Sequence, residues 1–321
     1  MRLLAFAALV LASPAWAQAQ ALSKPVRVIV PFPAGGGTDV LARIVAEKLR
    51  ASSGSAVIVE NRVGASGRTG VEAVKNAEPD GATLLFTPDF LMTVYPHSFR
   101  RLSYDPVADF APVAIVARSQ LALAAGPAVP RAVRGVRDYI EWVRANPKSG
   151  FFATTSAGGT PHFVGVMLAK AAGAELSPVH YKGGAPALQD LLGGQVPASI
   201  NPVGELLPYV KSGKIRVLAT TGVERSEFLP EVPTMAEAGY RDVVVQSWLG
   251  FLAPARTPQD TVSRLADAII AAAAGDDATE SMRKFGMRAQ TSGPAAFGAT
   301  LQADLVRWAP IVKASGFTAE D

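Results

Sequence analysis

Three consecutive glycines at positions 35–37 stand where a backbone could bind an anion. They follow the apolar run Val26–Val30, which predicts a buried strand, and precede a helix predicted from Asp39 to near Arg50. Glycine lets backbone N–H groups come close to a ligand, and the first N–H groups of a helix have no partner inside it. We therefore expect this loop to hold a charged oxygen. Its candidate ligand residues are Phe32, Ala34, Gly35, Gly36, Gly37, Thr38 and Asp39.

A second glycine loop of similar design follows about 120 residues later, a separation close to one domain length. It joins a strand predicted at Gly150–Thr155 to a helix predicted at Pro161–Ala172. Ser156 and Thr160 are either hydroxyl donors to a ligand or residues that stabilise the turn. His162 is either a donor to an acid or a surface or capping side chain. The candidates in this loop are Thr155, Ser156, Ala157, Gly158, Thr160 and His162.

Five more candidates lie in or just after other predicted strands: Thr87, Asp89, Lys182, Asn201 and Trp248. Lys182 either neutralises a ligand carboxylate or is an ordinary solvated lysine. Trp248 is either a wall of the binding pocket or part of the core. In the first loop, Asp39 is either the N-cap of its helix, a polar ligand contact, or both.

Strand-like and helix-like segments alternate along the chain, which predicts an α/β protein with mainly parallel sheets flanked by helices. The predicted strands include Ala56–Glu60, Ala82–Thr87, Ala111–Ala117, Leu121–Ala125, Val179–Tyr181, Val196–Asn201, Ile215–Thr220 and Val243–Leu252. Such sheets bind ligands at the carboxyl ends of their strands, so two sheet edges facing each other across a hinge would form a cleft.

Two strands, Leu121–Ala125 and Trp248–Ala253, are expected to form the hinge. The predicted domain 1 comprises residues 22–123 plus 250–321, and the predicted domain 2 comprises residues 124–249. The helices predicted at Pro258–Ala274, Ala278–Phe285 and Ala295–Ser315 would return to cover domain 1.

Residues 1–19 have the pattern of a secretory signal peptide. Leu3–Ala12 is apolar but too short for a permanent membrane anchor, and Ala15-Trp16-Ala17 matches a cleavage site, with cleavage after Ala17 or Ala19. The net charge of +4 is scattered and aromatic residues are only 7%, so a nucleic-acid groove is not expected.

The sequence contains no recognisable catalytic, metal or cofactor site. A dinucleotide fingerprint starting at Gly35 would need glycine where Val40 stands, and no G-K-[ST] follows the glycines. The segment Thr154–Gly158 lacks the first glycine of a hydrolase nucleophile elbow. The chain has no cysteine, and its three histidines lack zinc-ligand spacing. We therefore predict a protein that is not an enzyme and needs no cofactor.

Several segments, in this order and spacing, resemble the Bug family of periplasmic solute-binding proteins, also called the TctC family, of tripartite tricarboxylate transporters. They are Lys24–Phe32 with Gly35–Asp39, Glu60–Arg62, Pro79–Gly81, Tyr104–Pro106 with Asp109–Val113, Tyr181–Leu188 with Asp190–Val196, Val232–Thr234 with Glu237–Gly239, and Leu252–Pro254. The resemblance covers the whole chain after the signal peptide, and the segment from Tyr181 is the most specific.

The resemblance implies a two-domain Venus-flytrap fold that binds a small carboxylated solute between its domains and delivers it to a membrane permease. It implies that one ligand carboxylate meets the Phe32–Asp39 loop, partly through water, and that the other end meets Thr155–His162. A monomer is the default for such a receptor. An alternative is a periplasmic receptor that acts on a sensor kinase without transport, and a secreted enzyme is disfavoured.

Two positions depart from the family pattern. Pro88-Asp89-Phe90 and Pro202 stand where relatives usually carry small polar residues. If Asp89 points into the cleft, its carboxylate would repel a second ligand carboxylate and attract an ammonium group. This leads to the hypothesis of a monocarboxylate with an amino, hydroxyl or aromatic part, and with Phe90 and Trp248 as apolar walls.

Overall fold

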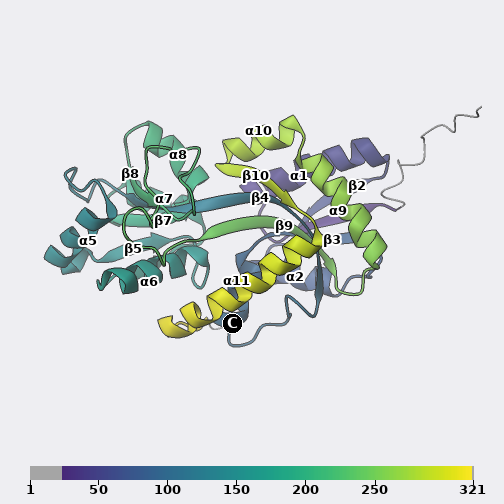
Figure 1. The fold of residues 1–321 in the computed structure, drawn as a ribbon, viewed down its shortest axis with the longest axis horizontal. Helices are drawn as coiled ribbons and strands as arrows, with labels where there is room; N and C mark the ends of the chain where they lie inside the picture. Colours follow the sequence, from purple (N-terminus) through teal and green to yellow (C-terminus); the bar gives the residue numbers. More distant parts are fainter. Residues whose placement is uncertain (1–23, 320–321) are drawn as a thin grey trace, which may run out of the picture.

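A computed structural model gives the structure of the protein and describes residues 24–319. The predicted signal peptide lies outside the described residues. Two groups of strands and helices lie side by side, and the long strand β4 runs from one to the other (Figure 1). No helix within the described part of the chain is long and apolar enough to cross a membrane.

The elements before the crossing are β1 (Val26–Val30), α1 (Gly37–Ser53), β2 (Val57–Asn61), α2 (Arg68–Lys75), β3 (Thr83–Pro88), α3 (Phe90–Thr93) and α4 (Tyr95–Ser98). Those between the crossings are α5 (Val136–Ala145), β5 (Phe151–Thr154), α6 (Thr160–Ala172), β6 (Ser177–His180), α7 (Gly184–Leu192), β7 (Ala198–Pro202), α8 (Val203–Lys211) and β8 (Arg216–Thr220). The crossing strand is β4 (Phe110–Ala125), and the last elements are β9 (Gln246–Pro254), α9 (Gln259–Ala273), α10 (Asp276–Lys284), β10 (Met287–Ser292) and α11 (Pro294–Ser315).

Strand β4 is one strand of 16 residues, whereas the sequence predicted two. The polar residues Arg118, Ser119 and Gln120, which separate the two predicted strands, stay extended and pair with Trp248, Ser247 and Gln246 of β9. Up to Gln120 the partners of β4 are β9 and β10, and from Leu121 they are β7 and β8.

This change of partners divides the fold. We call residues 24–120 with 246–319 lobe 1, and residues 121–245 lobe 2. The predicted domain boundaries at 123/124 and 249/250 lie close to it and remain a prediction.

The strands that carry the glycine loops pair in parallel. In lobe 1, β1 lies between β2 and β3, and in lobe 2, β5 lies between β6 and β7. Parallel strands have their carboxyl ends at the same edge, so the loops after β1 and β3 are neighbours, as are those after β5 and β7. The strands that join the lobes pair in antiparallel fashion, which makes the sheets mixed.

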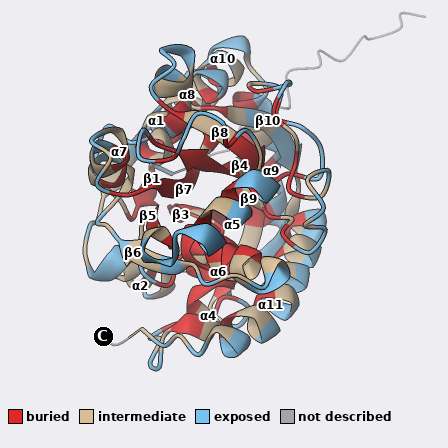
Figure 2. Ribbon diagram, turned by 90° about the vertical axis from the view of Figure 1, so that its left-hand side faces the viewer, coloured by how far each residue is buried: buried red, intermediate tan, exposed pale blue. Residues whose placement is uncertain are grey.

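Helices cover both faces of the lobe 1 sheet. Helices α1, α9 and α10 pack on one face and α2, α3 and α11 on the other. The strands between them are largely buried (Figure 2). Helix α11 was predicted to cover domain 1, but it also packs on lobe 2, because Trp308 and Val312 belong to the core of that lobe. Strand β10 was not anticipated, since it pairs only with β4 and its side chains are largely polar.

Close packing of α6 on β5 gives a test of this fold. A methyl group on Gly165 of α6 would lie 2.0 Å from the ring of Phe152, so Gly165→Ala should destabilise the protein by about 1–3 kcal/mol. The matched variant Gly298→Ala in α11 meets only Pro112 at 3.9 Å and should be neutral or stabilising. Urea denaturation of both variants measures the difference, and equal midpoints would contradict the packing.

Candidate functional site

The first glycine loop is organised by the carboxylate of Asp39. Its Oδ2 accepts hydrogen bonds from the Gly35 N–H at 2.9 Å and from Arg43 Nε at 3.0 Å, and its Oδ1 accepts from Asn61 Nδ2 at 2.8 Å. Asn61 Nδ2 also donates to the carbonyl of Phe32. Asp39 therefore ties the loop to β2 and to α1.

Asp39 is not the N-cap of the helix, because α1 begins at Gly37 and its N-cap is Gly36. Its side chain reaches back from the first turn and is only 2% exposed. Burial by itself would raise the pKa of Asp39, but the hydrogen bonds from Arg43, Gly35 and Asn61 outweigh it and lower the pKa. Asp39 is therefore charged at neutral pH, and its buried carboxylate fixes the conformation of the loop through these hydrogen bonds.

The backbone of this loop is left open to a ligand. Ala34, Gly35 and Gly36 are exposed, while Gly37 and Thr38 are half-buried. Asp39 uses the N–H of Gly35. The donors that remain include the N–H groups of Gly36, Gly37 and Thr38, which have no acceptor within residues 24–319. Phe32 and Phe90 are half-buried and their rings lie 6.1 Å apart beside the loop.

The second glycine loop is held by His162. Its Nδ1 accepts a hydrogen bond from the Gly158 N–H at 3.2 Å, and its ring contacts those of Phe163, His180 and Phe317. Burial, and then the neighbouring His180, lowers the pKa of His162 to about 4, so the imidazole is neutral. In this structure His162 is 3% exposed and supports the loop.

Thr160 is the most informative residue of the second loop. It is the first residue of α6 and is buried, yet its Oγ1 has no hydrogen-bond partner within the described chain. Ser156 and Thr155 are half-buried and Ala157 is exposed. A buried hydroxyl without a partner is costly, so Thr160 Oγ1 is a candidate donor to a ligand.

The predicted wall Trp248 is a core residue. It is fully buried, its ring packs 4.8 Å from that of Phe297, and its Nε1 donates to Asp304 Oδ2 at 3.0 Å. Trp248 and Leu249 are successive residues of β9 and point to opposite faces of the sheet. The contacts with Phe297 and Asp304 show that Trp248 points toward α11. Thr87 is also fully buried and donates to the carbonyl of Pro88.

Asp89 does not present a charge to a ligand. It is 2% exposed, its N–H donates to the carbonyl of Trp248 at 3.0 Å, and its Oδ1 has no partner within residues 24–319. Burial, and then the Asp304 carboxyl, raises the pKa of Asp89 to about 8, although Ser247 and Arg307 oppose this. The side chain is buried and mainly neutral at pH 7, so the condition under which Asp89 would repel a second ligand carboxylate, a charged group that points into the cleft, is not met in this structure.

Sequence reasoning missed Glu205, in the first turn of α8. Asn201 Nδ2 donates to Glu205 Oε2 at 2.9 Å, and Asn201 itself is fully buried. Lys182, which was predicted, is exposed and has no ion pair among the described residues. The signal that could have found Glu205 is its place in the first turn of a helix that directly follows a strand-end asparagine.

Both glycine loops lie where the lobes meet. A methyl group on Gly37 would lie 3.3 Å from the ring of Phe285, and one on Gly204 of lobe 2 would lie 1.9 Å from the carbonyl oxygen of Phe285. Ser98 Oγ of lobe 1 donates to the carbonyl of Gly158 in the second loop. The structure thus brings both loops to the boundary between the lobes, whereas it places Thr87, Asp89 and Trp248 in the interior.

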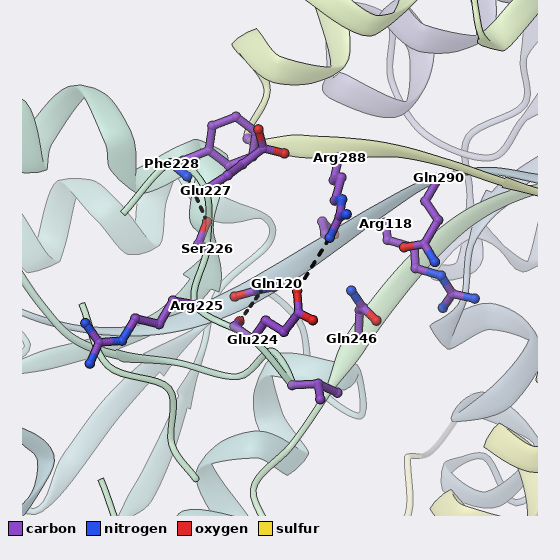
Figure 3. A pocket seen from close by; sticks show the side chains of 13 residues that line it. Arg118, Gln120, Glu224, Arg225, Ser226, Glu227, Phe228, Gln246, Arg288 and Gln290 are labelled. Carbon is purple, nitrogen blue, oxygen red and sulfur yellow. Dashed lines mark hydrogen bonds and ion pairs between the residues drawn. The ribbon is translucent and has the colours of Figure 1, made fainter. Parts of the chain in front are cut away.

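A cavity of about 450 Å³ also lies between the lobes (Figure 3). It is lined by Arg118, Ser119, Gln120, Val223, Glu224, Arg225, Ser226, Glu227, Phe228, Gln246, Gly286, Arg288 and Gln290, none of which is a predicted ligand residue. Met287 reaches toward Gly37, whereas the next residue, Arg288, lines the cavity. Successive strand residues point to opposite faces, so the cavity and the first glycine loop lie on opposite faces of the sheet.

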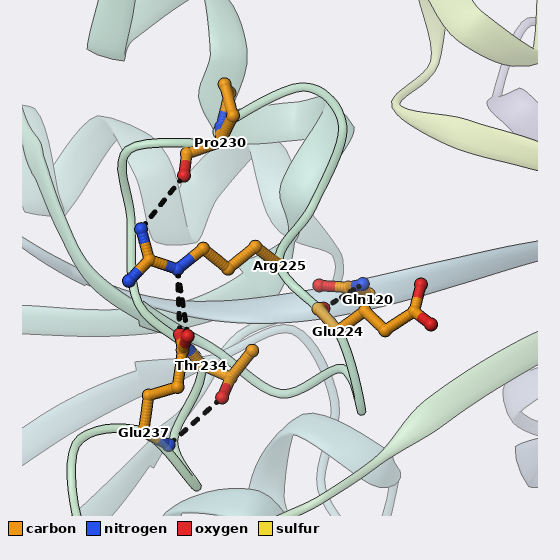
Figure 4. Close-up of polar contacts among 6 residues, drawn as sticks. All are labelled: Gln120, Glu224, Arg225, Pro230, Thr234 and Glu237. Carbon is orange, nitrogen blue, oxygen red and sulfur yellow. Dashed lines mark hydrogen bonds and ion pairs between the residues drawn. The ribbon is translucent and has the colours of Figure 1, made fainter.

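The segment of lobe 2 that borders this cavity is firmly attached. Arg225 binds both carboxylate oxygens of Glu237 and the carbonyl of Pro230, and Gln120 Nε2 donates to the carbonyl of Glu224 (Figure 4). Two ion pairs, Arg288–Glu224 and Arg283–Glu227, connect it to lobe 1. Contacts between the lobes therefore form on both faces of the crossing strands.

Within residues 24–319 no group of three or more acidic or histidine side chains is arranged to hold a metal ion. The features of the boundary are instead free backbone N–H groups, an unpartnered hydroxyl and two half-buried aromatic rings. Such a surface can bind a small polar molecule, and it offers most to an anion.

Solved structures of periplasmic binding proteins share this arrangement of lobes. The periplasmic binding protein BugD has a TM-score of 0.80 and 32% sequence identity, over 94% of this chain and 100% of BugD. R. palustris Rpa4515 with adipate has a TM-score of 0.83 and 31% identity, over 93% and 99% of the two chains. MatC from Rhodopseudomonas palustris with bound malate has a TM-score of 0.78 and 27% identity, over 90% and 99%. The fold is that of a two-domain periplasmic binding protein.

The chain belongs to the TctC family, because the model of the tripartite tricarboxylate transporter family receptor matches residues 41–317. Protein BugT of Bordetella pertussis (strain Tohama I) is 32% identical over 295 residues, 92% of this chain and 90% of BugT. The UPF0065 protein in the tcbD-tcbE intergenic region of Pseudomonas sp. (strain P51) is 34% identical over 291 residues, 90% and 86% of the two chains. These findings confirm the predicted family and identify the protein as a solute-binding receptor.

The three hydrogen bonds of Asp39 lead to a pH-dependent prediction. Since its folded-state pKa lies below the unfolded value near 3.9, its stabilisation is complete above that value and is lost as the pH falls through the folded pKa. Asp39→Asn should cost about 1–3 kcal/mol at pH 7 and little near pH 2. Urea titrations at both pH values measure this, with the exposed Asp242→Asn as the control; a cost that does not change with pH would contradict it.

Asp89 should have the opposite pH dependence. Its folded-state pKa of about 8 lies above the unfolded value near 3.9, so ionisation of this carboxyl destabilises the fold increasingly between about pH 4 and pH 8. Asp89→Asn should therefore gain stability relative to the wild type, by a few kcal/mol, between pH 5 and pH 8. Thermal unfolding across this range measures the gain, and parallel curves for the two proteins would show that Asp89 is charged.

Proposed function

We propose that this receptor captures a small carboxylate-bearing solute in a cleft between its lobes and delivers it to a tripartite tricarboxylate-type membrane transporter. The observation that carries the proposal is the pair of glycine loops at the boundary between the lobes. One offers the free N–H groups of Gly36, Gly37 and Thr38, and the other offers the unpartnered hydroxyl of Thr160.

The energetics favour a site that uses both loops. A charge-assisted hydrogen bond contributes about 1.5–3 kcal/mol, so a ligand that accepts from three N–H groups of the first loop gains at most about 9 kcal/mol. Micromolar affinity needs about 8 kcal/mol net, after an association cost of at least about 4 kcal/mol. One loop therefore falls short, and a ligand that also contacts Ser156 or Thr160 would hold the lobes together.

The ligands of two similar structures support a carboxylate. Rpa4515 was solved with adipate and MatC with malate, and both resemble this chain over at least 90% of its length. The family description supports a partnership with a tripartite transporter, and the predicted signal peptide supports a periplasmic location. We propose a monomer that needs no cofactor and catalyses no reaction. The sensory alternative, in which the loaded receptor acts on a sensor kinase, differs only in the partner.

Thermal shift with adipate and malate tests the proposal, with the uncharged diamides of the same acids as controls. A ligand at a hundredfold excess over its Kd adds about 2.7 kcal/mol of stability, which is a clear rise in Tm. We expect at least one acid to raise the Tm and neither diamide to do so. Equal shifts for acids and diamides would contradict carboxylate recognition.

Thr160→Val separates binding from folding. The variant removes a buried hydroxyl that has no partner, so the ligand-free protein should be as stable as the wild type or more so. Its affinity for the acid that binds should fall about tenfold, measured by isothermal titration, because a hydrogen bond to the ligand is lost. Thr257→Val removes another buried, unpartnered hydroxyl away from the loops and should leave the affinity unchanged. Equal affinities of the two variants would remove Thr160 from the site.

A further inference from the structure

Glu205 occupies an unusual position for a carboxylate. A methyl group on Gly184, the first residue of α7, would lie 1.9 Å from Glu205 Oε2, so the carboxylate packs directly against the start of that helix. The only hydrogen bond to the side chain within residues 24–319 comes from Asn201 Nδ2, at 2.9 Å. Glu205 nevertheless remains accessible to solvent. It therefore lies in a concave place that is open on one side.

No positive side chain balances this carboxylate. Glu205 forms no ion pair with any described lysine, arginine or histidine, and Lys182, which precedes the same helix, contributes no contact to it. Burial raises the pKa of Glu205, which the hydrogen bond from Asn201 only partly offsets. Water can reach this carboxylate and solvate its charge in the ligand-free protein, and an ammonium group of a ligand is the kind of partner that can replace that water.

Glu205 also lies close to the first glycine loop. The preceding residue, Gly204, packs against Phe285, and Phe285 packs against Gly37. Gly204 and Gly37 thus contact the same residue, which places Glu205 and the free N–H groups of lobe 1 in the same part of the boundary between the lobes. A single small molecule could place a carboxylate on the N–H groups and a second polar group on Glu205.

We propose that Glu205 determines specificity by accepting a hydrogen bond from an ammonium group of the solute, so that the receptor prefers amino acids to carboxylic acids without an amino group. This inference rests on the proposed function. The juxtaposition that carries it is an accessible, unbalanced carboxylate beside the anion-binding loop. Glu205, in place of the buried Asp89, supplies the negative charge that an ammonium group requires.

Glu205 could instead only stabilise the first turn of α7, where a negative charge is favourable. The two roles differ in what the variant Glu205→Gln changes. A structural role alters the Tm of the ligand-free protein and the affinities for all ligands alike. A role in specificity alters the ratio of affinities for two ligands that differ only in the amino group.

The experiment is isothermal titration with matched pairs: succinate and aspartate, adipate and 2-aminoadipate, and 3-phenylpropionate and phenylalanine. The proteins are the wild type, Glu205→Gln, Glu205→Asp and the exposed control Glu175→Gln. In at least one pair the wild type and Glu175→Gln should bind the amino acid at least about tenfold more tightly. Glu205→Gln should lose this preference and keep its affinity for the parent acid, whereas Glu205→Asp should retain part of the preference.

The outcomes separate this inference from the function on which it rests. Wild-type binding of the parent acids with no preference for the amino acids, or a preference that survives in Glu205→Gln, overturns the assignment of Glu205 and leaves the receptor intact. Malate is titrated beside succinate and aspartate. A preference for malate over succinate, without a preference for aspartate, assigns Glu205 to a hydroxyl group and also overturns the inference. Failure of all seven compounds to bind contradicts carboxylate recognition itself, and the inference fails with it.

Discussion

The continuous hydrogen bonding of β4 is the constraint on which the rest of the structure depends. Its first part completes the lobe 1 sheet with β9 and β10, and its last five residues complete the lobe 2 sheet with β7 and β8. A strand that belongs to two sheets cannot leave either without exposing a row of unpaired backbone groups. The lobes therefore keep a fixed connection at Gln120 and Leu121, where the partners of β4 change.

Ionisable side chains near this crossing lack hydrogen-bond partners within residues 24–319 for part of their polar atoms, in contrast to Asp39 at the first glycine loop. Asp39 has three donors and stays ionised, whereas Asp89 lies near Asp304, with an unpartnered oxygen and a raised pKa. Arg118 of β4 is close enough to influence both carboxyls electrostatically, but burial lowers its own pKa and its Nε has no partner in the described chain. Hydrogen bonds thus fix the first glycine loop, whereas Asp89 and Arg118, which lack a full set of partners among the described residues, lie near the crossing.

The lobes are also linked away from the crossing strands. Helix α11 begins on the lobe 1 sheet and ends in the lobe 2 core, and Phe317 beyond it packs on the His162 that supports the second glycine loop. On the opposite face, ion pairs from Arg283 and Arg288 border the cavity between the lobes. A change in the angle between the lobes would therefore alter contacts at both glycine loops and at the cavity together.

The sequence alone determined the family, most of the helices and strands, and the two glycine loops, because glycine runs, strand periodicity and motif spacing are local properties of the chain. It predicted a hinge strand at Leu121–Ala125, whereas the structure shows that the partners of β4 change between Gln120 and Leu121. Only the tertiary structure decided that β4 is one strand, since the polar residues at 118–120 are held extended by β9, far away in sequence. It likewise decided that Trp248 and Asp89 are buried and that Glu205 is accessible. Burial and charge balance depend on what packs against a side chain, and no local pattern records which distant segment that will be.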